Sequence, residues 1–103
     1  MIMSRSVIRA KRGHNNDVVQ MLKGIMGNMK QAAGDRLKGY RIYSNYTGDN
    51  SLIILEEEYE SVADWDVSFQ NLSTTDAYEV DFDKYWELFT SWERDFWVVE
   101  AEG

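Results

Sequence analysis

The stretch from Leu52 to Asp66 reads LIILEEEYESVADWD, and it is the part of the sequence that decides the fold. Four aliphatic residues in a row, followed at once by three glutamates, are typical of a strand that is apolar on both faces. Successive side chains of a strand point to opposite sides, so Leu52 and Ile54 point one way while Ile53 and Leu55 point the other. A sheet that contains this strand therefore needs cover on both faces.

A helix is predicted directly after this strand. Ser61, with Asp64 three residues later, is a near match to the capping box, in which a hydroxyl accepts a hydrogen bond from a free backbone N–H of the first turn. Apolar residues then recur at helical spacing. They are Val62, Trp65, Phe69 and Leu72. The cluster STTD interrupts this helix at Thr74 or Thr75, and a second helical segment is predicted from about Tyr78 to Thr90.

The beginning of the chain predicts one strand and one long helix. Residues 6–12 (SVIRAKR) alternate loosely between apolar and polar side chains, as in a strand. Asn15 or Asn16 can cap a helix over residues 17–33, and Gly34 is placed to end it with a positive φ. The apolar stripe of this helix is formed by Val18, Leu22, Ile25, Met29 and Ala32.

Two glycines, Gly24 and Gly27, lie inside this predicted helix. Each costs roughly 1 kcal/mol relative to alanine at a helix interior position. They indicate either that a strand or a ligand approaches the helix closely there, or that the helix simply tolerates them.

The remaining elements complete a β-α-β-β-α-β order. Residues 37–46 (LKGYRIYSNY) alternate and form a hairpin with residues 51–59 through the turn cluster TGDN. Residues 94–100 (RDFWVVE) predict the last strand, with Phe96 and Val98 opposed to Trp97 and Val99. This order predicts one α+β domain over residues 1–103, a ferredoxin-like fold in which a four-stranded antiparallel sheet carries both helices on one face.

The apolar outer face of this sheet predicts a partner subunit. Leaving Ile53, Leu55 and Trp97 in water would forgo ~1.5–3 kcal/mol of burial for each side chain. It would also expose an apolar patch of a size that usually marks an interaction site. We therefore expect a symmetric homodimer through the open sheet face, with Glu56 to Glu58 marking the point where the strand returns to solvent.

Composition excludes several classes of protein. The net charge of −7 argues against binding to nucleic acid, and the absence of cysteine excludes disulfides, thiolate metal sites and a cysteine nucleophile. The N-terminus MIMSRSVIRAKRG lacks the apolar segment of a signal peptide, and no apolar run approaches the ~18 residues of a membrane helix. We expect a cytoplasmic protein that does not bind membranes.

Three motifs resemble the dimeric α/β-barrel superfamily of ferredoxin-like domains, over almost the whole chain. They are a glycine in the loop after the first strand (Gly13), the tyrosine-rich strand GYRIYSN, and the run EEEYESVADW. The last is similar to the corresponding segment of the antibiotic-biosynthesis-monooxygenase group. The resemblance implies that two sheets join into a barrel in the dimer, and that a ligand pocket lies between each sheet and its own helices.

The resemblance leaves several chemistries to weigh. Haem-degrading relatives place a histidine ligand on the second helix, whereas the single histidine here, His14, lies in the loop before the first helix. No metal motif or phosphate-binding loop is visible, so we predict no cofactor and no metal. The RNA-recognition domain shares the element order, but its basic-glycine-aromatic signature is replaced here by SLIILEEEY.

The aromatic residues suggest a binding pocket for a small, mainly apolar or aromatic molecule between helices and sheet. The predicted ligand-binding residues are His14 at the mouth, Tyr40 from the sheet, and Trp65, Phe69, Tyr78 and Trp86 from the second helical region. One alternative is a cofactor-independent monooxygenase acting on an aromatic or quinol-like substrate. The other is a structural or interaction module whose aromatic residues form only a core.

Overall fold

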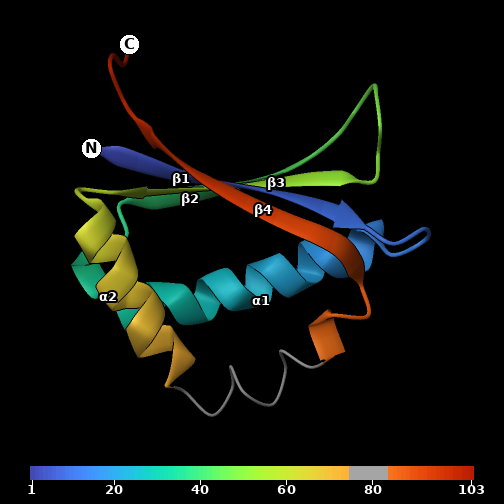
Figure 1. Ribbon diagram of the computed structural model, residues 1–103, viewed down its shortest axis with the longest axis horizontal. Coiled ribbons are helices and arrows are strands. Elements are labelled where there is room, and N and C mark those ends of the chain that lie inside the picture. Colours follow the sequence, from blue (N-terminus) through green and yellow to red (C-terminus); the bar gives the residue numbers. More distant parts are fainter. Residues whose placement is uncertain (75–83) are drawn as a thin grey trace.

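The computed structural model describes residues 1–74 and 84–103, in which one sheet carries two helices on the same face (Figure 1). Figure 1 shows the sheet nearly edge-on, with α1 and α2 together below it and both chain termini at one end. The elements are β1 (Ile2–Ala10), α1 (Asn15–Ala33), the 3₁₀ turn η1 (Gly34–Arg36), β2 (Gly39–Ser44), β3 (Leu52–Tyr59), α2 (Val62–Ser73) and β4 (Phe89–Val98).

The sheet has the strand order β2-β3-β1-β4, and all its neighbouring strands are antiparallel. This arrangement confirms the predicted ferredoxin-like α+β fold. None of the helices in the described residues is long and apolar enough to cross a membrane.

Two strand boundaries differ from the prediction. The first strand begins at Ile2 and ends at Ala10, because its early residues pair with both β3 and β4. The last strand begins at Phe89, where pairing with Ala10 starts, so the predicted helical segment from about Tyr78 to Thr90 is wrong at its end. Residues 75–83, including Tyr78, lie outside the described residues.

The alternation along β3 defines the two faces of the sheet. Ile53 and Leu55 are 0% and 1% exposed and pack beneath the helices, so their predicted place on the outer face is wrong. Leu52 and Ile54 take that place, because the helices cover the opposite set of side chains. The same period continues through the glutamates, so Glu57 is buried, and its predicted return to solvent is also wrong.

The core lies between this inner face and α1. The apolar stripe of α1 turns toward the sheet, which is what a helix with one apolar face must do to remove that face from water. The fully buried residues that form the core include Ile8, Val18, Leu22, Met26, Ile53, Leu55 and Tyr59.

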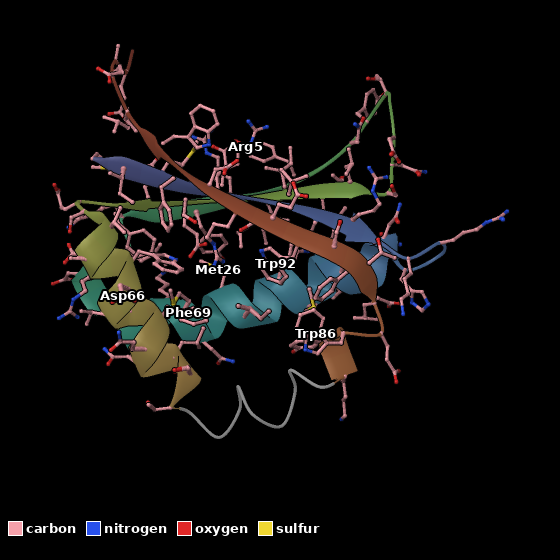
Figure 2. All side chains as sticks on the ribbon, in the orientation of Figure 1. Arg5, Met26, Asp66, Phe69, Trp86 and Trp92 are labelled. Atoms are coloured by element: carbon pink, nitrogen blue, oxygen red, sulfur yellow. The ribbon has the colours of Figure 1, made fainter. Side chains whose placement is uncertain are left out.

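The other side of the sheet, which we call the open face, carries neither α1 nor α2 (Figure 1). A charged row crosses it, in which Arg41, Glu56, Arg5 and Asp95 lie directly opposite one another on successive strands with alternating sign. Figure 2 shows Arg5 pointing away from the helices. Apolar side chains flank this row on both sides, with Glu58 opposite Met3 and Glu93 opposite Val7. The apolar ones are Met3, Val7, Tyr43, Leu52, Ile54 and Trp97.

The helix ends follow the sequence signals in part. The Ser61 hydroxyl accepts a hydrogen bond from the Asp64 backbone N–H at 3.2 Å, as the capping pattern predicts. Gly34 ends α1 with a φ of +58°. At the other end α1 begins at Asn15 with His14 as its cap residue, so neither asparagine caps the helix; the Asn15 side chain instead donates a hydrogen bond to the Asn50 carbonyl.

Gly24 and Gly27 are exposed, and a Cβ added at either position meets no atom of the described residues within 4 Å. No strand of the described residues therefore approaches closely at these positions, which favours the interpretation that the helix tolerates both glycines. We expect Gly24→Ala and Gly27→Ala each to raise the free energy of unfolding by roughly 1 kcal/mol, because alanine restricts the unfolded chain and fits the helix. Urea denaturation at one fixed protein concentration measures this.

Gly34→Ala serves as the opposing control for these two substitutions. Its φ of +58° is costly for a residue with a Cβ, so this variant should lose about 1–2 kcal/mol of stability. If all three alanine variants are destabilised alike, the helix interior has a packing demand that the open space around Gly24 and Gly27 does not explain.

Candidate functional site

A cavity of about 230 Å³ lies between the sheet and the two helices. Figure 2 shows Met26 and Trp92 in the layer between α1 and the sheet, with Phe69 on α2 to one side and Trp86 to the other. The lining is mostly apolar and aromatic. The described residues that line it are Ile25, Met26, Met29, Leu55, Glu57, Trp65, Phe69, Leu72, Trp86, Phe89, Trp92 and Arg94.

Two serines on the central strand make room under the helices. Ser4 and Ser6 of β1 face the helices and are fully buried. Ser4 lies opposite Glu57 of β3, and Ser6 lies opposite Arg94 of β4. The outer two of three adjacent strands are about 10 Å apart, so their side chains meet only by reaching across the middle strand. The small side chains of Ser4 and Ser6 leave space for Glu57 and Arg94 to approach each other across β1.

Glu57 is the buried acid of the cavity, with 2% of its surface exposed. One oxygen, Oε1, accepts a hydrogen bond from the Tyr59 hydroxyl at 2.8 Å. The other, Oε2, lies 4.0 Å from Arg94 Nη2, a distance that allows charge attraction but no hydrogen bond. Burial raises the pKa of Glu57 above its ordinary value, while the Tyr59 hydrogen bond and the Arg94 charge oppose that rise. Burial likewise raises the pKa of Tyr59.

Arg94 is held between two indole rings. Its guanidinium carbon lies 5.0 Å from the ring centre of Trp65 and 5.9 Å from that of Trp92, within the range of cation–π attraction. Three buried N–H donors have no hydrogen-bond partner in the part of the chain that the structure describes: Arg94 Nε, Trp65 Nε1 and Trp92 Nε1. The buried hydroxyls of Ser4 and Ser6 have no partner there either. Buried polar groups normally have partners, so these donors, like Glu57 Oε2, call for an explanation.

The structure brings three of the predicted site residues together. Trp65, Phe69 and Trp86 all line the cavity. Trp65 stacks on Phe69 with ring centres 5.5 Å apart, and it meets Phe96 edge-on at 5.0 Å. The helical spacing of Trp65 and Phe69 therefore builds one aromatic wall.

Two other predicted residues lie away from the cavity. His14 does not line it and instead pairs with Asp17 at 2.9 Å near the start of α1. Tyr40 lies on the edge strand β2, is 41% exposed, and is also absent from the lining. Tyr78 lies outside the described residues.

The sequence reasoning missed Glu57, Arg94 and Trp92. The signal for Glu57 was present, because counting by twos from Ile53 places it on the same face as Tyr59. Trp92 and Arg94 have the same two-residue spacing and share a face with Phe96 in β4. Recognising that alternation required the strand to begin earlier than the sequence indicated.

Among the residues that the structure describes, no group of three or more histidine, cysteine, aspartate and glutamate side chains could hold a metal ion. Among the described lining residues, the polar groups are the Glu57 carboxyl, the Arg94 guanidinium and the indole N–H groups of Trp65, Trp86 and Trp92. This set can bind and orient a polar group or exchange a proton with it.

Stability should depend on pH through Glu57. Because its pKa is higher in the folded protein than its ordinary value of 4.5, the folded state holds the proton more tightly than the unfolded state. The contribution of Glu57 to stability is therefore fully present below pH 4.5 and is lost as the pH rises through the folded pKa. Relative to the wild type, Glu57→Gln should therefore gain stability as the pH rises through that window, on the order of 1 kcal/mol.

The measurement is urea denaturation at several pH values, with Glu56→Gln as the matched control. Glu56 is the neighbouring residue on the open face, so its substitution removes the same charge without changing the cavity. A constant difference between Glu57→Gln and the wild type from acid to neutral pH would contradict the raised pKa.

Among the comparisons with known proteins, only the solved structures give matches. No protein-family model and no curated protein matches the chain. An uncharacterized NIPSNAP domain protein from Burkholderia xenovorans is similar in structure, with a TM-score of 0.80, 16% identity, and coverage of 98% of this chain and 96% of that one. A NIPSNAP family protein from Agrobacterium tumefaciens gives a TM-score of 0.78 at 17% identity, covering 94% and 90%.

An antibiotic biosynthesis monooxygenase-like protein from Deinococcus radiodurans is also similar. Its TM-score is 0.72 at 14% identity, with 99% of this chain and 95% of that chain covered. These likenesses span nearly the whole of each chain. At such identities they establish the ferredoxin-like fold that the sequence motifs predicted, and they leave the activity to be argued from the cavity.

Proposed function

We propose that this protein is a homodimer that binds a small, mainly apolar molecule in the cavity between α1, α2 and the sheet. The observation that carries the proposal is the cavity of about 230 Å³, walled by aromatic and aliphatic side chains, with buried polar atoms that lack partners among the described residues. Ligand sites typically combine an apolar wall with a few orienting polar groups.

The size of the cavity favours a ligand over a structural module with only a core. Protein interiors are close-packed, and voids larger than a water molecule are few. An engineered apolar cavity of about 150 Å³ already binds benzene, so this space suits a molecule with one or two aromatic rings.

The direct test is native mass spectrometry of the purified protein, followed by denaturing spectra of the same sample. Extra mass that disappears on denaturation would identify a bound small molecule and its size. A clean native spectrum, together with no binding of added naphthalene-type compounds, would contradict the proposal.

Trp65→Ala should weaken binding of the neutral probe 1-naphthamide roughly tenfold or more, because it removes the indole that forms one wall of the cavity. Isothermal titration calorimetry measures the affinity. Val67→Ala is the matched control, since Val67 lies on the same helix but is exposed and does not line the cavity. Unchanged binding by folded Trp65→Ala would remove this residue from the site.

The open face supports the dimer. Trp97 of β4 remains 52% exposed there, and Tyr43 of β2 and Ile54 of β3 lie on the same face of the sheet. The loop between β2 and β3 rises on this side of the sheet (Figure 1), and its Tyr46 is 99% exposed. The charged row is balanced by its alternating signs, so a second copy can cover it without burying net charge.

A cofactor-independent monooxygenase is the second candidate, and Glu57 is the observation that favours it. A buried carboxylate whose pKa is raised can take a proton from the hydroxyl of a quinol-like substrate held between aromatic walls. Oxygen consumption with a panel of quinols tests this. Activity that is lost in Glu57→Gln and kept in Glu56→Gln would establish it.

A further inference from the structure

We infer that the ligand of the cavity is an apolar monocarboxylate, held by Arg94 and the indole N–H groups of Trp65 and Trp92, and that it binds together with one proton taken up by Glu57. The inference rests on the proposed function, because it names the chemical class of the molecule that the same cavity holds.

The unpaired donors match a carboxylate. An ionised carboxyl group is an acceptor only, with about four lone-pair sites on its two oxygens. The cavity offers Arg94 Nε and the two indole N–H groups as buried donors without partners in the described residues. A neutral ligand with a single acceptor would leave some of these donors unpaired, which is costly for buried groups.

Arg94 can donate more hydrogen bonds than the described residues accept from it. Its contact with Glu57 is 4.0 Å long, and its Nε donates to no described residue. Arginine binds carboxylates best through two parallel hydrogen bonds, and Glu57 does not provide that pair here. A carboxylate from a ligand can accept hydrogen bonds from these donors while the two nearby indole rings hold the guanidinium by cation–π attraction.

Glu57 is the group that must respond to such a ligand. Two carboxylates that share one buried cation cannot both remain ionised, so one of them takes up a proton. The ligand carboxylate and the Glu57 carboxylate, with one proton from solvent, give a bound anion beside a protonated Glu57. The protonated acid then donates a hydrogen bond from Oε2 to the ligand, so the unpaired acceptor becomes a donor.

Among the described residues that line the cavity, Glu57 is the one carboxylate that can take up a proton. Among the described residues, Tyr59 lies on the same strand and Tyr40 lies opposite on β2. Arg94 comes from β4, while β1 presents only Ser4. The cavity-lining side chains of α1 and α2 are uncharged. Burial raises the pKa of Glu57 even without a ligand, which makes proton uptake easier.

The test compares 1-naphthoate with 1-naphthamide, which has nearly the same shape but no charge, by isothermal titration calorimetry. Titrations in two buffers of different ionisation enthalpy measure the protons taken up. We expect naphthoate to bind the wild-type protein roughly ten- to a hundredfold more tightly than naphthamide, because charge-assisted hydrogen bonds are stronger than neutral ones. Binding of naphthoate at neutral pH should take up as much as one proton per ligand.

Two variants test the roles of Glu57 and Arg94 separately. Glu57→Gln should keep the preference for naphthoate, since an amide N–H can replace the protonated acid as a donor, but proton uptake should disappear. Arg94→Lys retains the charge without the planar fork and should reduce the preference. The wild-type comparison and Glu57→Gln decide the question even if substitution of Arg94 prevents folding.

Each other outcome is decisive. Naphthamide binding as tightly as naphthoate would overturn the inference and leave the apolar pocket standing. Preference for naphthoate without proton uptake would overturn the pairing with Glu57, and with it the inference. If neither compound binds, the proposed function itself fails.

Discussion

Replacing Arg94 with methionine is expected to lower the free energy of unfolding by about 3 kcal/mol at about pH 8, and by much less at about pH 4. Methionine retains most of the apolar stem but removes the charge that lies 4.0 Å from the buried carboxylate of Glu57. Removing one partner of a buried ion pair leaves the other charge uncompensated. Since Glu57 is 2% exposed, water cannot take over the role of the guanidinium.

The pH dependence separates this cause from loss of packing. Without Arg94 the pKa of Glu57 rises further, because the attraction that opposed the effect of burial is gone. A group whose pKa is raised in the folded state loses its stabilising contribution as the pH rises above its unfolded value. Below pH 4.5 Glu57 is protonated in both states, so the remaining loss reports only the packing of the side chain.

Urea denaturation of Arg94→Met at both pH values, at one fixed protein concentration, measures the effect. Arg12→Met is the control, because Arg12 lies exposed in the loop before α1 and should cost less than about 1 kcal/mol at either pH. The double variant with Glu57→Gln should recover most of the loss at the higher pH. Equal destabilisation of Arg94→Met at both pH values would show that the ion pair contributes little.

Local patterns in the sequence were enough to predict the fold. The aliphatic run of β3 and the Ser61 cap are set by residues close together in the chain, so the strand and the start of α2 were predicted correctly. The residues next to β3 in the sequence could not show which of its two faces is buried. Alternation separates Leu52 and Ile54 from Ile53 and Leu55, but only the docking of α1 decides which pair is buried.

Only the part of the candidate site that follows from local sequence patterns could be predicted. Trp65 and Phe69 share a helix, so their spacing alone placed them on one wall. Glu57 was expected in solvent because glutamate is almost never fully buried unless it is paired. Its partner Arg94 comes from the last strand, and the contact depends on small side chains on β1 between them. No local pattern contains this combination.

Ile54→Arg is expected to convert the proposed dimer into a monomer of 12.0 kDa. Ile54 lies near the middle of the open face, between Tyr43 and Val7 and beside the charged row. That row is balanced, so a facing subunit can cover it. The acid of this row on the same strand, Glu56, already lies between Arg5 and Arg41. An added arginine therefore brings an excess positive charge, and burying an unpaired charge costs several kcal/mol per ion.

Multi-angle light scattering at micromolar concentration distinguishes the two states. Gln20→Arg is the matched control, since it adds the same charge at an exposed position on α1, on the helical side of the sheet. The wild type and Gln20→Arg should show twice the chain mass, while Ile54→Arg should show the chain mass and keep its helical circular dichroism, because the substituted side chain does not face the core. A wild-type monomer, or an Ile54→Arg dimer, would mean that the open face is not the interface. The exposed positions of Trp97 and Tyr46 would then require another explanation.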